Sequence, residues 1–149
     1  MATTPNGLPY PLPSADLRLG AGDIQALATA LDLQGTAKAP VTVALATNVS
    51  GLAGTIRVYR VGAAVLVDVD VSGATFADGA SVVISGTAGV PAALRPTVGT
   101  RFGAAYMTSG YPGFVYVNTS GAVTVQHRSG ANRSTARGVI VYPISDLGG

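Results

Sequence analysis

The sequence predicts a mostly β protein: an antiparallel β-sandwich or jelly-roll head preceded by an extended arm and one short α-helix. Three observations lead to this fold class. Short runs of alternating apolar residues, separated by glycine and asparagine turns, follow one another from residue 41 to residue 142. Prolines recur near the N-terminus and exclude helix there. A single segment, residues 22–34, has apolar residues at helical spacing.

The chain of 149 residues carries few charges: 11% of its residues are charged, against about 25% in ordinary globular proteins. Glutamate is absent, and Lys38 is the only lysine. So few charges cover the surface of a monomer poorly, and the composition therefore favours burial of part of that surface against other subunits. A coding bias toward alanine, glycine, valine and arginine is the alternative explanation.

The net charge of +2 and the pI of 9.2 reflect scarce acids rather than a basic cluster, which gives little support to nucleic-acid binding. Cysteine is absent, so disulfides and thiolate metal sites are excluded. No apolar stretch approaches the ~20 residues of a membrane span, and residues 1–13 do not have the pattern of a signal peptide. We expect a soluble protein made in a cytoplasm, with no nucleic-acid partner and no membrane insertion.

The first 21 residues are predicted to form an extended, proline-rich arm. Its prolines remove backbone donors at alternate positions, as in polyproline-like segments. Apolar side chains alternate with these prolines: Leu8, Tyr10 and Leu12. Disordered tails are normally more polar than this, so the pattern favours an attachment arm that docks on a partner. A tail without structure is the alternative.

The helix predicted at residues 22–34 has Asp23 as its N-cap, with Ile24, Leu27 and Leu31 along one side. It spans about three turns, and isolated helices shorter than ~12–15 residues are marginal in water. We therefore expect these three apolar residues to pack against copies of the same helix. Residues 35–53 are predicted to form a linker with one strand, and residues 54–149 the β head.

The clearest strand pair is a hairpin over Thr55–Val71, with a two-residue turn at Gly62-Ala63 that satisfies the type II′ requirement. The turn sets apolar residues opposite one another on one face and opposite charges together on the other. The expected pairs are Ile56 with Val69, Val58 with Val67, Arg57 with Asp68, and Tyr59 with Leu66. This chemical agreement on both faces predicts the register.

The remaining strands are expected at residues 81–85, 100–107, 114–117, 122–128 and 138–142, with a turn at 72–79 and a long loop at 86–98. A second hairpin joins 114–117 to 122–128. Its register stays open, because a bulge at Gly121 would exchange the face that carries Phe114 and Tyr116.

The sequence offers few residues that could serve in catalysis. His127 is the only histidine, and it alternates with Val123 and Val125, which favours a strand residue at the edge of the core over a Ser-His-Asp triad. Asp68 and Asp70 share one strand face, and a solvated pair with Asp68 bonded to Arg57 is favoured over a hydrolase or Ca²⁺ site. We expect no enzyme activity, no metal and no cofactor.

Aromatic residues crowd around Tyr111-Pro112-Gly113: Tyr106, Tyr111, Phe114 and Tyr116. Tyrosine offers a flat apolar face and a hydroxyl group, a combination suited to sugar rings. Arginines near the polar loop at 129–135 can contact phosphates or acidic glycans, although such residues are more often simply surface. The candidate saccharide contacts are Tyr111, Tyr106, Tyr116, Arg128 and Arg133. Core packing competes with this interpretation, and we expect Phe114 and one strand tyrosine in the core, with Tyr111 the most exposed.

Two parts of the chain carry a family resemblance. The segment PNGLPYPLPSADLRLGAGDIQALATALD at Pro5–Asp32 resembles the N-terminal segment of minor tail proteins of phages infecting actinobacteria. The rest is similar to the small β head that ends many siphophage tail proteins. The features that carry this second likeness are GTIRVYRVGAAVLVDVDVSG, a Leu94-Arg95-Pro96 turn before a strand, and NTSGAVTV followed by an apolar strand.

The resemblance implies a virion protein made in the host cytoplasm: a tail-associated homotrimer, at a minor tail or tail-tip position. Leu8, Tyr10 and Leu12 would attach the arm to other virion proteins, and Ile24, Leu27 and Leu31 would bundle the helices. The heads would face outward and bind a host cell-surface glycan. A capsid decoration or head-fibre protein with a purely structural role is the alternative.

Overall fold

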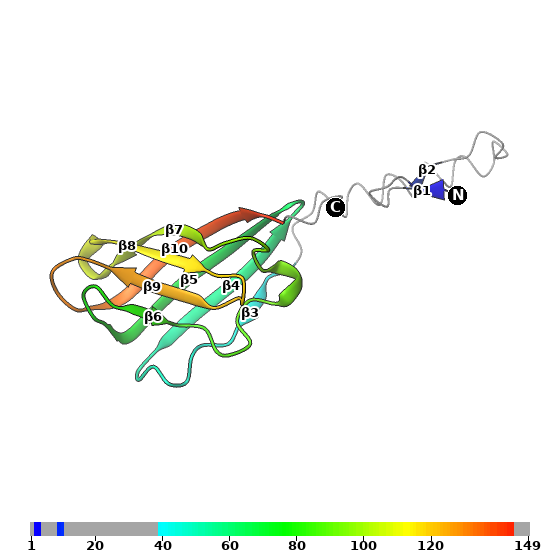
Figure 1. Ribbon diagram of the computed structural model, residues 1–149. Coiled ribbons are helices and arrows are strands. Elements are labelled where there is room, and N and C mark those ends of the chain that lie inside the picture. The colour runs from blue at the N-terminus through cyan, green and yellow to red at the C-terminus, as the bar shows by residue number, and fades with distance from the viewer. Residues whose placement is uncertain (1, 4–8, 11–38, 145–149) are drawn as a thin grey trace. The chain divides into compact units, whose positions relative to one another are not determined.

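The structure, a computed structural model, describes residues 2–3, 9–10 and 39–144 (Figure 1). The chain divides into two compact units, one of Met1–Ala37 with Asp146–Gly149 and one of Lys38–Ser145. In the first unit, β1 (Ala2–Thr3) and β2 (Pro9–Tyr10) pair antiparallel. The helix predicted at 22–34, with Ile24, Leu27 and Leu31, lies outside the described residues, as do Leu8 and Leu12 of the arm.

The second unit is a β head built from one eight-stranded sheet. Its strands are β3 (Val41–Val43), β4 (Ala53–Val61), β5 (Ala64–Phe76), β6 (Ser81–Val83), β7 (Arg101–Met107), β8 (Pro112–Val117), β9 (Val123–His127) and β10 (Arg133–Pro143). The spatial order is β3-β4-β5-β10-β7-β8-β9-β6, and each neighbouring pair is antiparallel. Two short 3₁₀ turns interrupt the connections, η1 (Ala92–Leu94) and η2 (Thr108–Gly110).

The sheet curls until its two edges meet. A bridge joins Leu45 to Ser85, the amide of Gly86 donates to the carbonyl oxygen of Ala44 at 2.7 Å, and the amide of Ala46 donates to Ile84 at 2.8 Å. These bonds join the segments directly after the edge strands β3 and β6, so the two edges of the sheet are held together there. The prediction of a mostly β protein with an antiparallel head is therefore confirmed. The head is one curled sheet, however, rather than the two separate layers of a sandwich (Figure 1).

The first hairpin has the predicted register, with Ile56 opposite Val69 and Arg57 opposite Asp68. Gly62 has φ of 56°, as the first central position of a II′ turn requires. The turn predicted at residues 72–79 begins too early, because β5 continues to Phe76, which is buried and pairs with Arg133, and the turn is confined to residues 77–80. The register of the pairing between β5 and β10 shifts here, because Arg133 pairs with Phe76 and Thr135 pairs with Ser72. Residues 73–75 therefore stay within β5 as an irregularity of the sheet.

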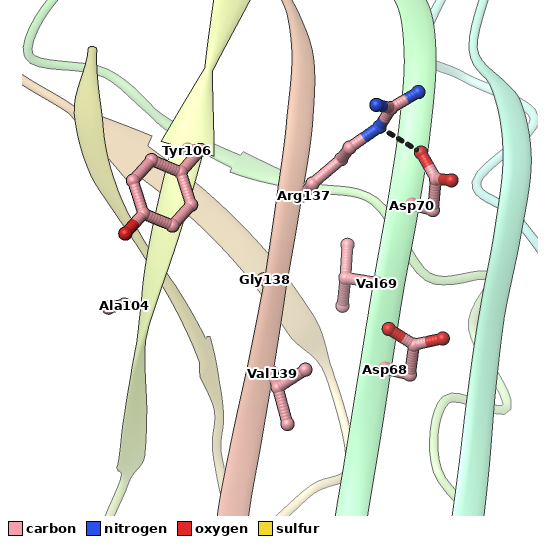
Figure 2. Close-up of a pocket in the computed structure, with 8 residues that line it drawn as sticks. All are labelled: Asp68, Val69, Asp70, Ala104, Tyr106, Arg137, Gly138 and Val139. Atoms are coloured by element: carbon pink, nitrogen blue, oxygen red, sulfur yellow. Dashed lines mark hydrogen bonds and ion pairs between the residues drawn. The ribbon is translucent and has the colours of Figure 1, made fainter. Parts of the chain in front are cut away.

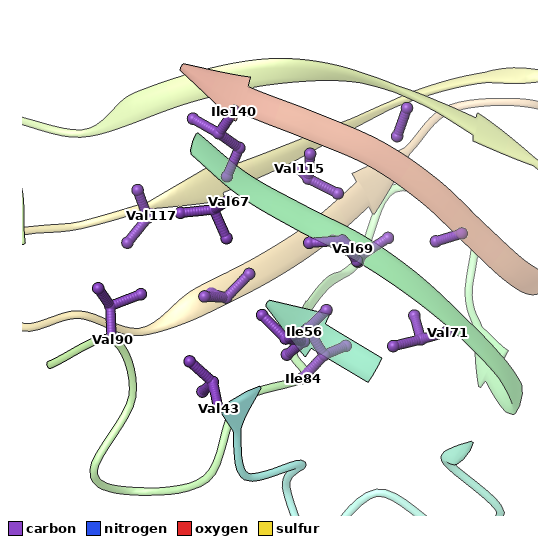
Figure 3. Close-up of a cluster of buried hydrophobic side chains, with 14 of the residues drawn as sticks. Val43, Ile56, Val67, Val69, Val71, Ile84, Val90, Val115, Val117 and Ile140 are labelled. Atoms are coloured by element: carbon purple, nitrogen blue, oxygen red, sulfur yellow. The ribbon is translucent and has the colours of Figure 1, made fainter. Parts of the chain in front are cut away.

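The core lies inside the curl, and alternation along each strand supplies it (Figure 3). Its fully buried members include Ile56, Val67, Val69, Val71, Ile84, Val115, Val117 and Ile140. The second hairpin pairs Val115 with Val125 and Phe114 with Gln126. Since Val115 points inward, Phe114 points outward, and its side chain is 55% exposed. The expectation that Phe114 belongs to the core is wrong.

The two ends of the head differ. The amide of Ile144 donates to the carbonyl oxygen of Ala63, so the described chain leaves the head beside the Gly62-Ala63 turn. Connections at the opposite end form what we call the loop end: residues 77–80, 108–111 and 128–132 (Figure 1). Among the residues that the structure describes, no helix is long and apolar enough to cross a membrane.

Candidate functional site

An open groove of about 500 Å³ lies on the outer face of the sheet, over β5, β10 and β7 (Figure 2). Gly138 of β10 lies between its two sides, and Ala104 lies on the same strand as Tyr106. Tyr106, 70% exposed, stands on one side, and the carboxylates of Asp68 and Asp70 stand on the other. The groove thus places an aromatic ring and two carboxylates on opposite sides of a shallow, open surface.

Strand order creates this groove. On β5, Val67, Val69 and Val71 point into the core, so Asp68 and Asp70 point outward. β10 runs beside β5 and places Arg137 opposite Asp70. On its other side, β10 places the same Arg137 opposite Tyr106 of β7. Segments separated by about thirty residues or more in sequence therefore supply the two sides of one groove.

The ion pair on this face joins Arg137 to Asp70, with 2.9 Å between Nε and Oδ1. Arg57 and Asp68 lie opposite each other, as predicted, but the expected bond between them is not the ion pair that forms in the described part of the chain. Both side chains of the Arg137–Asp70 pair are more than half exposed, so the pair contributes only about 0–1 kcal/mol to stability.

A second hollow, of about 380 Å³, continues the groove toward the loop end. It shares Tyr106 and Arg137 with the first, and η2 forms much of its wall. Thr108 holds η2 against β10, because its Oγ1 accepts hydrogen bonds from the amides of Ser134 and Thr135, both at 2.9 Å. Tyr106 therefore stands between the two hollows of one continuous depression.

Next to the groove, the outer face carries what we call the apolar patch: Phe102, Phe114, Tyr116 and Val141. Phe102, Phe114 and Val141 are 63%, 55% and 62% exposed. The rings of Phe102 and Tyr116 contact each other, with 5.2 Å between their centroids. Large apolar side chains that gather on an exposed sheet face indicate an interaction surface.

At the loop end, the guanidinium of Arg133 lies over the ring of Tyr111, 3.7 Å from its centroid. Its Nε donates to Ser129 Oγ at 2.7 Å. Ser129 belongs to the loop between β9 and β10, and Asp78 fixes this loop: Asp78 Oδ1 accepts from the amides of Ser129 at 2.7 Å and Gly130 at 3.0 Å. The structure therefore brings Tyr111 and Arg133 together on an ordered support.

His127 is fully buried behind this loop, as expected for a residue at the edge of the core. Its Nε2 lies 2.8 Å from the carbonyl oxygen of Phe76, so Nε2 carries the proton and donates. Nδ1 lies 3.1 Å from Ser129 Oγ, and the same hydroxyl lies 3.2 Å from the carbonyl oxygen of Ala131. Asp78 lies 3.7 Å from the same Nδ1. A triad needs the serine and the carboxylate on opposite ring nitrogens, so this arrangement does not activate Ser129.

The five candidate saccharide residues fall into three places. Tyr106 lines the groove, Tyr116 belongs to the apolar patch, and Tyr111 stacks with Arg133 at the loop end. Arg128 is exposed in the loop between β9 and β10. Tyr106 rather than Tyr111, which is 44% exposed, is the most exposed of the four clustered aromatics, because the even-numbered residues of β7 face outward.

The saccharide contacts predicted from the sequence do not include Asp68, Asp70 or Arg137. Alternation with buried valines indicates that both aspartates face outward, but the groove appears only once β10 is placed between β5 and β7. Within the described residues, no group of three or more histidines and carboxylates could hold a metal ion.

Comparison with known proteins finds no matching family model and no matching curated protein. Solved structures do match. The receptor-binding head domain of the lactococcal phage bIL170 aligns with a TM-score of 0.53 and 15% identity, over 71% of this chain and 97% of that one. The receptor-binding protein gp15 of Listeria phage PSA aligns with a TM-score of 0.52 and 16% identity, over 86% and 81%. At these identities the likeness shows a shared fold.

Proposed function

We propose that this chain is a tail-associated receptor-binding protein of a bacteriophage virion, whose β head binds a saccharide on the host surface. The observation that carries the proposal is the shared fold: the head domain of a lactococcal phage receptor-binding protein and the receptor-binding protein of a Listeria phage match most of this chain. The resemblance of Pro5–Asp32 to minor tail proteins supports the same role independently of the head.

The groove suits a saccharide. Tyr106 offers an exposed ring face for the apolar side of a sugar. Asp68 and Asp70 offer acceptors for sugar hydroxyl groups, and Arg137 offers donors. Ala104, exposed on β7, leaves room for a ring to approach the sheet beside Tyr106. Both aspartates project from one strand, whereas hydrolases place two carboxylates on either side of the scissile bond, so binding without cleavage is favoured.

The proposed assembly is a homotrimer attached to the virion. The apolar patch and the low charge of the chain support contact between heads. Ile24, Leu27 and Leu31 would join the helices, while Leu8, Tyr10 and Leu12 would dock the arm on other virion proteins. These roles rest on the sequence pattern and on the resemblance.

Binding of the full-length chain to a panel of bacterial envelope saccharides tests the function. Tyr106→Ala should weaken binding at least about tenfold, because it removes the stacking face. Tyr59→Ala is the matched control: this tyrosine lies on the outer side of β4 and does not line the groove, so its variant should bind as the unaltered chain does.

A map of the assembled particle completes this test. A tail position together with saccharide binding supports a receptor-binding role. A capsid position, with no binding to any envelope saccharide, would instead establish a decoration protein with a structural role.

A further inference from the structure

We infer that the loop end holds a second binding site, in which Arg133 takes the anionic group, carboxylate or phosphate, of an acidic saccharide. This site lies outside the groove, because Arg133 lines neither of its two hollows. The inference rests on the proposed function only in taking the ligand to be a saccharide. The recognition of an anion is argued from the arginine itself.

The guanidinium of Arg133 is held on two sides. One face lies on the Tyr111 ring at 3.7 Å. The inner edge faces Ser129, where Nε donates to Oγ at 2.7 Å and Nη2 makes a longer contact of 3.4 Å with the carbonyl oxygen. An arginine already fixed in this way loses little conformational freedom when it binds a ligand, which favours affinity.

The rest of the guanidinium is free to bind. Of its five N–H donors, the contacts with Ser129 use one on Nε and one on Nη2. The remaining donors, on Nη1 and Nη2, form the planar fork that matches the two oxygens of a carboxylate or phosphate. In the described part of the chain, no carboxylate lies within ion-pair distance of Arg133, whereas Asp70 neutralises Arg137.

The local charge also favours an anion. Arg128 and Arg133 lie at this end of the head against a single carboxylate, Asp78. The Oδ1 of Asp78 is already used by the amides of Ser129 and Gly130. Its role is to order the loop that carries Ser129, and it leaves the guanidinium fork unpaired.

Buried residues support the site from behind. His127, fully buried, contacts Ser129 from behind: its Nδ1 lies 3.1 Å from Ser129 Oγ, which also lies 3.2 Å from the carbonyl oxygen of Ala131, while Nε2 donates to Phe76. Ser129 is thus fixed through its amide and its hydroxyl, so that Oγ presents a lone pair to Arg133 Nε. An arginine with only a surface role does not need a buried histidine and a loop-binding aspartate behind it.

Two pairs of probes test the site by NMR titration of the full-length protein. Glucuronate is compared with neutral glucose, and glycerol phosphate with neutral glycerol. We expect the charged member of at least one pair to shift the Arg133 Nε–H signal and the amide signals of Ser129 and Gly130, and the neutral members to leave them unchanged. A response to glucuronate alone identifies a carboxylate ligand, and a response to glycerol phosphate alone identifies a phosphate ligand.

Arg133→Gln should weaken binding of the anionic probe at least about tenfold, because the fork of N–H donors is lost. Arg60→Gln removes the same charge from the opposite end of the head, beside the Gly62-Ala63 turn, and should change affinity less than about twofold. Arg133→Lys keeps the charge without the fork and should resemble Arg133→Gln. Spectra of each variant without ligand verify that the fold is unchanged.

Equal losses in the two Gln variants, or equal responses to charged and neutral probes, would overturn the inference. Saccharide binding that depends on Tyr106, without any response to the anionic probes, would overturn it while leaving the proposed function in place.

Discussion

The hydroxyl group of Tyr142 donates a 2.6 Å hydrogen bond to the carbonyl oxygen of Leu94. Tyr142 belongs to β10 and is 2% exposed, while Leu94 belongs to η1, inside the long loop between β6 and β7. Arg95 orders the same loop, since its Nε donates to Val90 at 2.7 Å and its Nη2 donates to Ala88 at 2.9 Å. Side-chain bonds to backbone therefore fix a loop that contains no strand.

Tyr142 should make the fold sensitive to alkaline pH. Burial raises the pKa of its hydroxyl from 10.0 to about 12. Above pH 10 the unfolded chain ionises this tyrosine while the folded chain keeps it neutral, so stability is fully present below pH 10 and falls as pH rises toward 12. Allowing for solvent screening, we expect a loss of about 1–2 kcal/mol, measured by urea unfolding at about pH 9 and about pH 11.

Tyr142→Phe is the control for this titration. The variant lacks the hydrogen bond and should be less stable by about 1 kcal/mol at neutral pH. Its stability should then fall less steeply between about pH 9 and about pH 11. Parallel pH profiles for the two proteins would show that other tyrosines produce the effect.

Gly103 allows β7 to approach β10. A Cβ at this position would clash with the carbonyl oxygen of Val139. Gly103→Ala should therefore push the two strands apart and reduce the free energy of unfolding by about 1–3 kcal/mol. Gly86→Ala is the control, because its Cβ would meet its nearest neighbours at 3.4 Å, an ordinary contact. Equal stability of the two variants in urea would contradict this close approach.

The first hairpin follows from local sequence, whereas the groove depends on pairing between strands that are distant in sequence. The hairpin around Gly62 was predictable because its turn fixes which residues face each other. The apolar pair Ile56–Val69 and the charged pair Arg57–Asp68 both fit that one register. The groove was not predictable in the same way. It depends on β10 lying between β5 and β7, a placement that no turn in the sequence specifies.

Two local predictions failed for a related reason. The turn chemistry around Gly73 suggested that β5 ends early, yet burial of Phe76 against its β10 neighbours extends the strand. Phe114, expected in the core from the sequence, is 55% exposed. The register of β8 instead points Val115 inward, and the smaller residue fills the core. Tertiary pairing decided both outcomes over local preference.

The apolar patch predicts how assembly responds to charge. Phe102→Asp places a carboxylate at the centre of the exposed aromatic contact with Tyr116. If copies of the head meet there, burying this unpaired charge is costly, and sedimentation should show a larger fraction of monomer. Val98→Asp is the control, since Val98 is 70% exposed in a loop outside the patch. A stable monomer of the unaltered chain at micromolar concentration would contradict assembly itself.

Asp78 supplies the sharpest test of order at the loop end. Its Oδ1 accepts two amide hydrogen bonds from residues 51 and 52 positions later in the chain, at 2.7 Å and 3.0 Å. Asp78→Ala removes the acceptor, so the amides of Ser129 and Gly130 should exchange with solvent at least about tenfold faster, the effect expected from losing about 1–3 kcal/mol of local stability. Hydrogen exchange followed by NMR measures both amides directly.

Asp78→Asn distinguishes the acceptor from the charge. The amide side chain keeps a carbonyl oxygen in the place of Oδ1, so exchange at Ser129 and Gly130 should stay within about threefold of the unaltered protein. Fast exchange in this variant as well would mean that the negative charge of Asp78 is required to hold the loop, in addition to the position of its acceptor oxygen. Slow exchange in Asp78→Asn and fast exchange in Asp78→Ala would show that two backbone hydrogen bonds keep Ser129, and through it Arg133, in place.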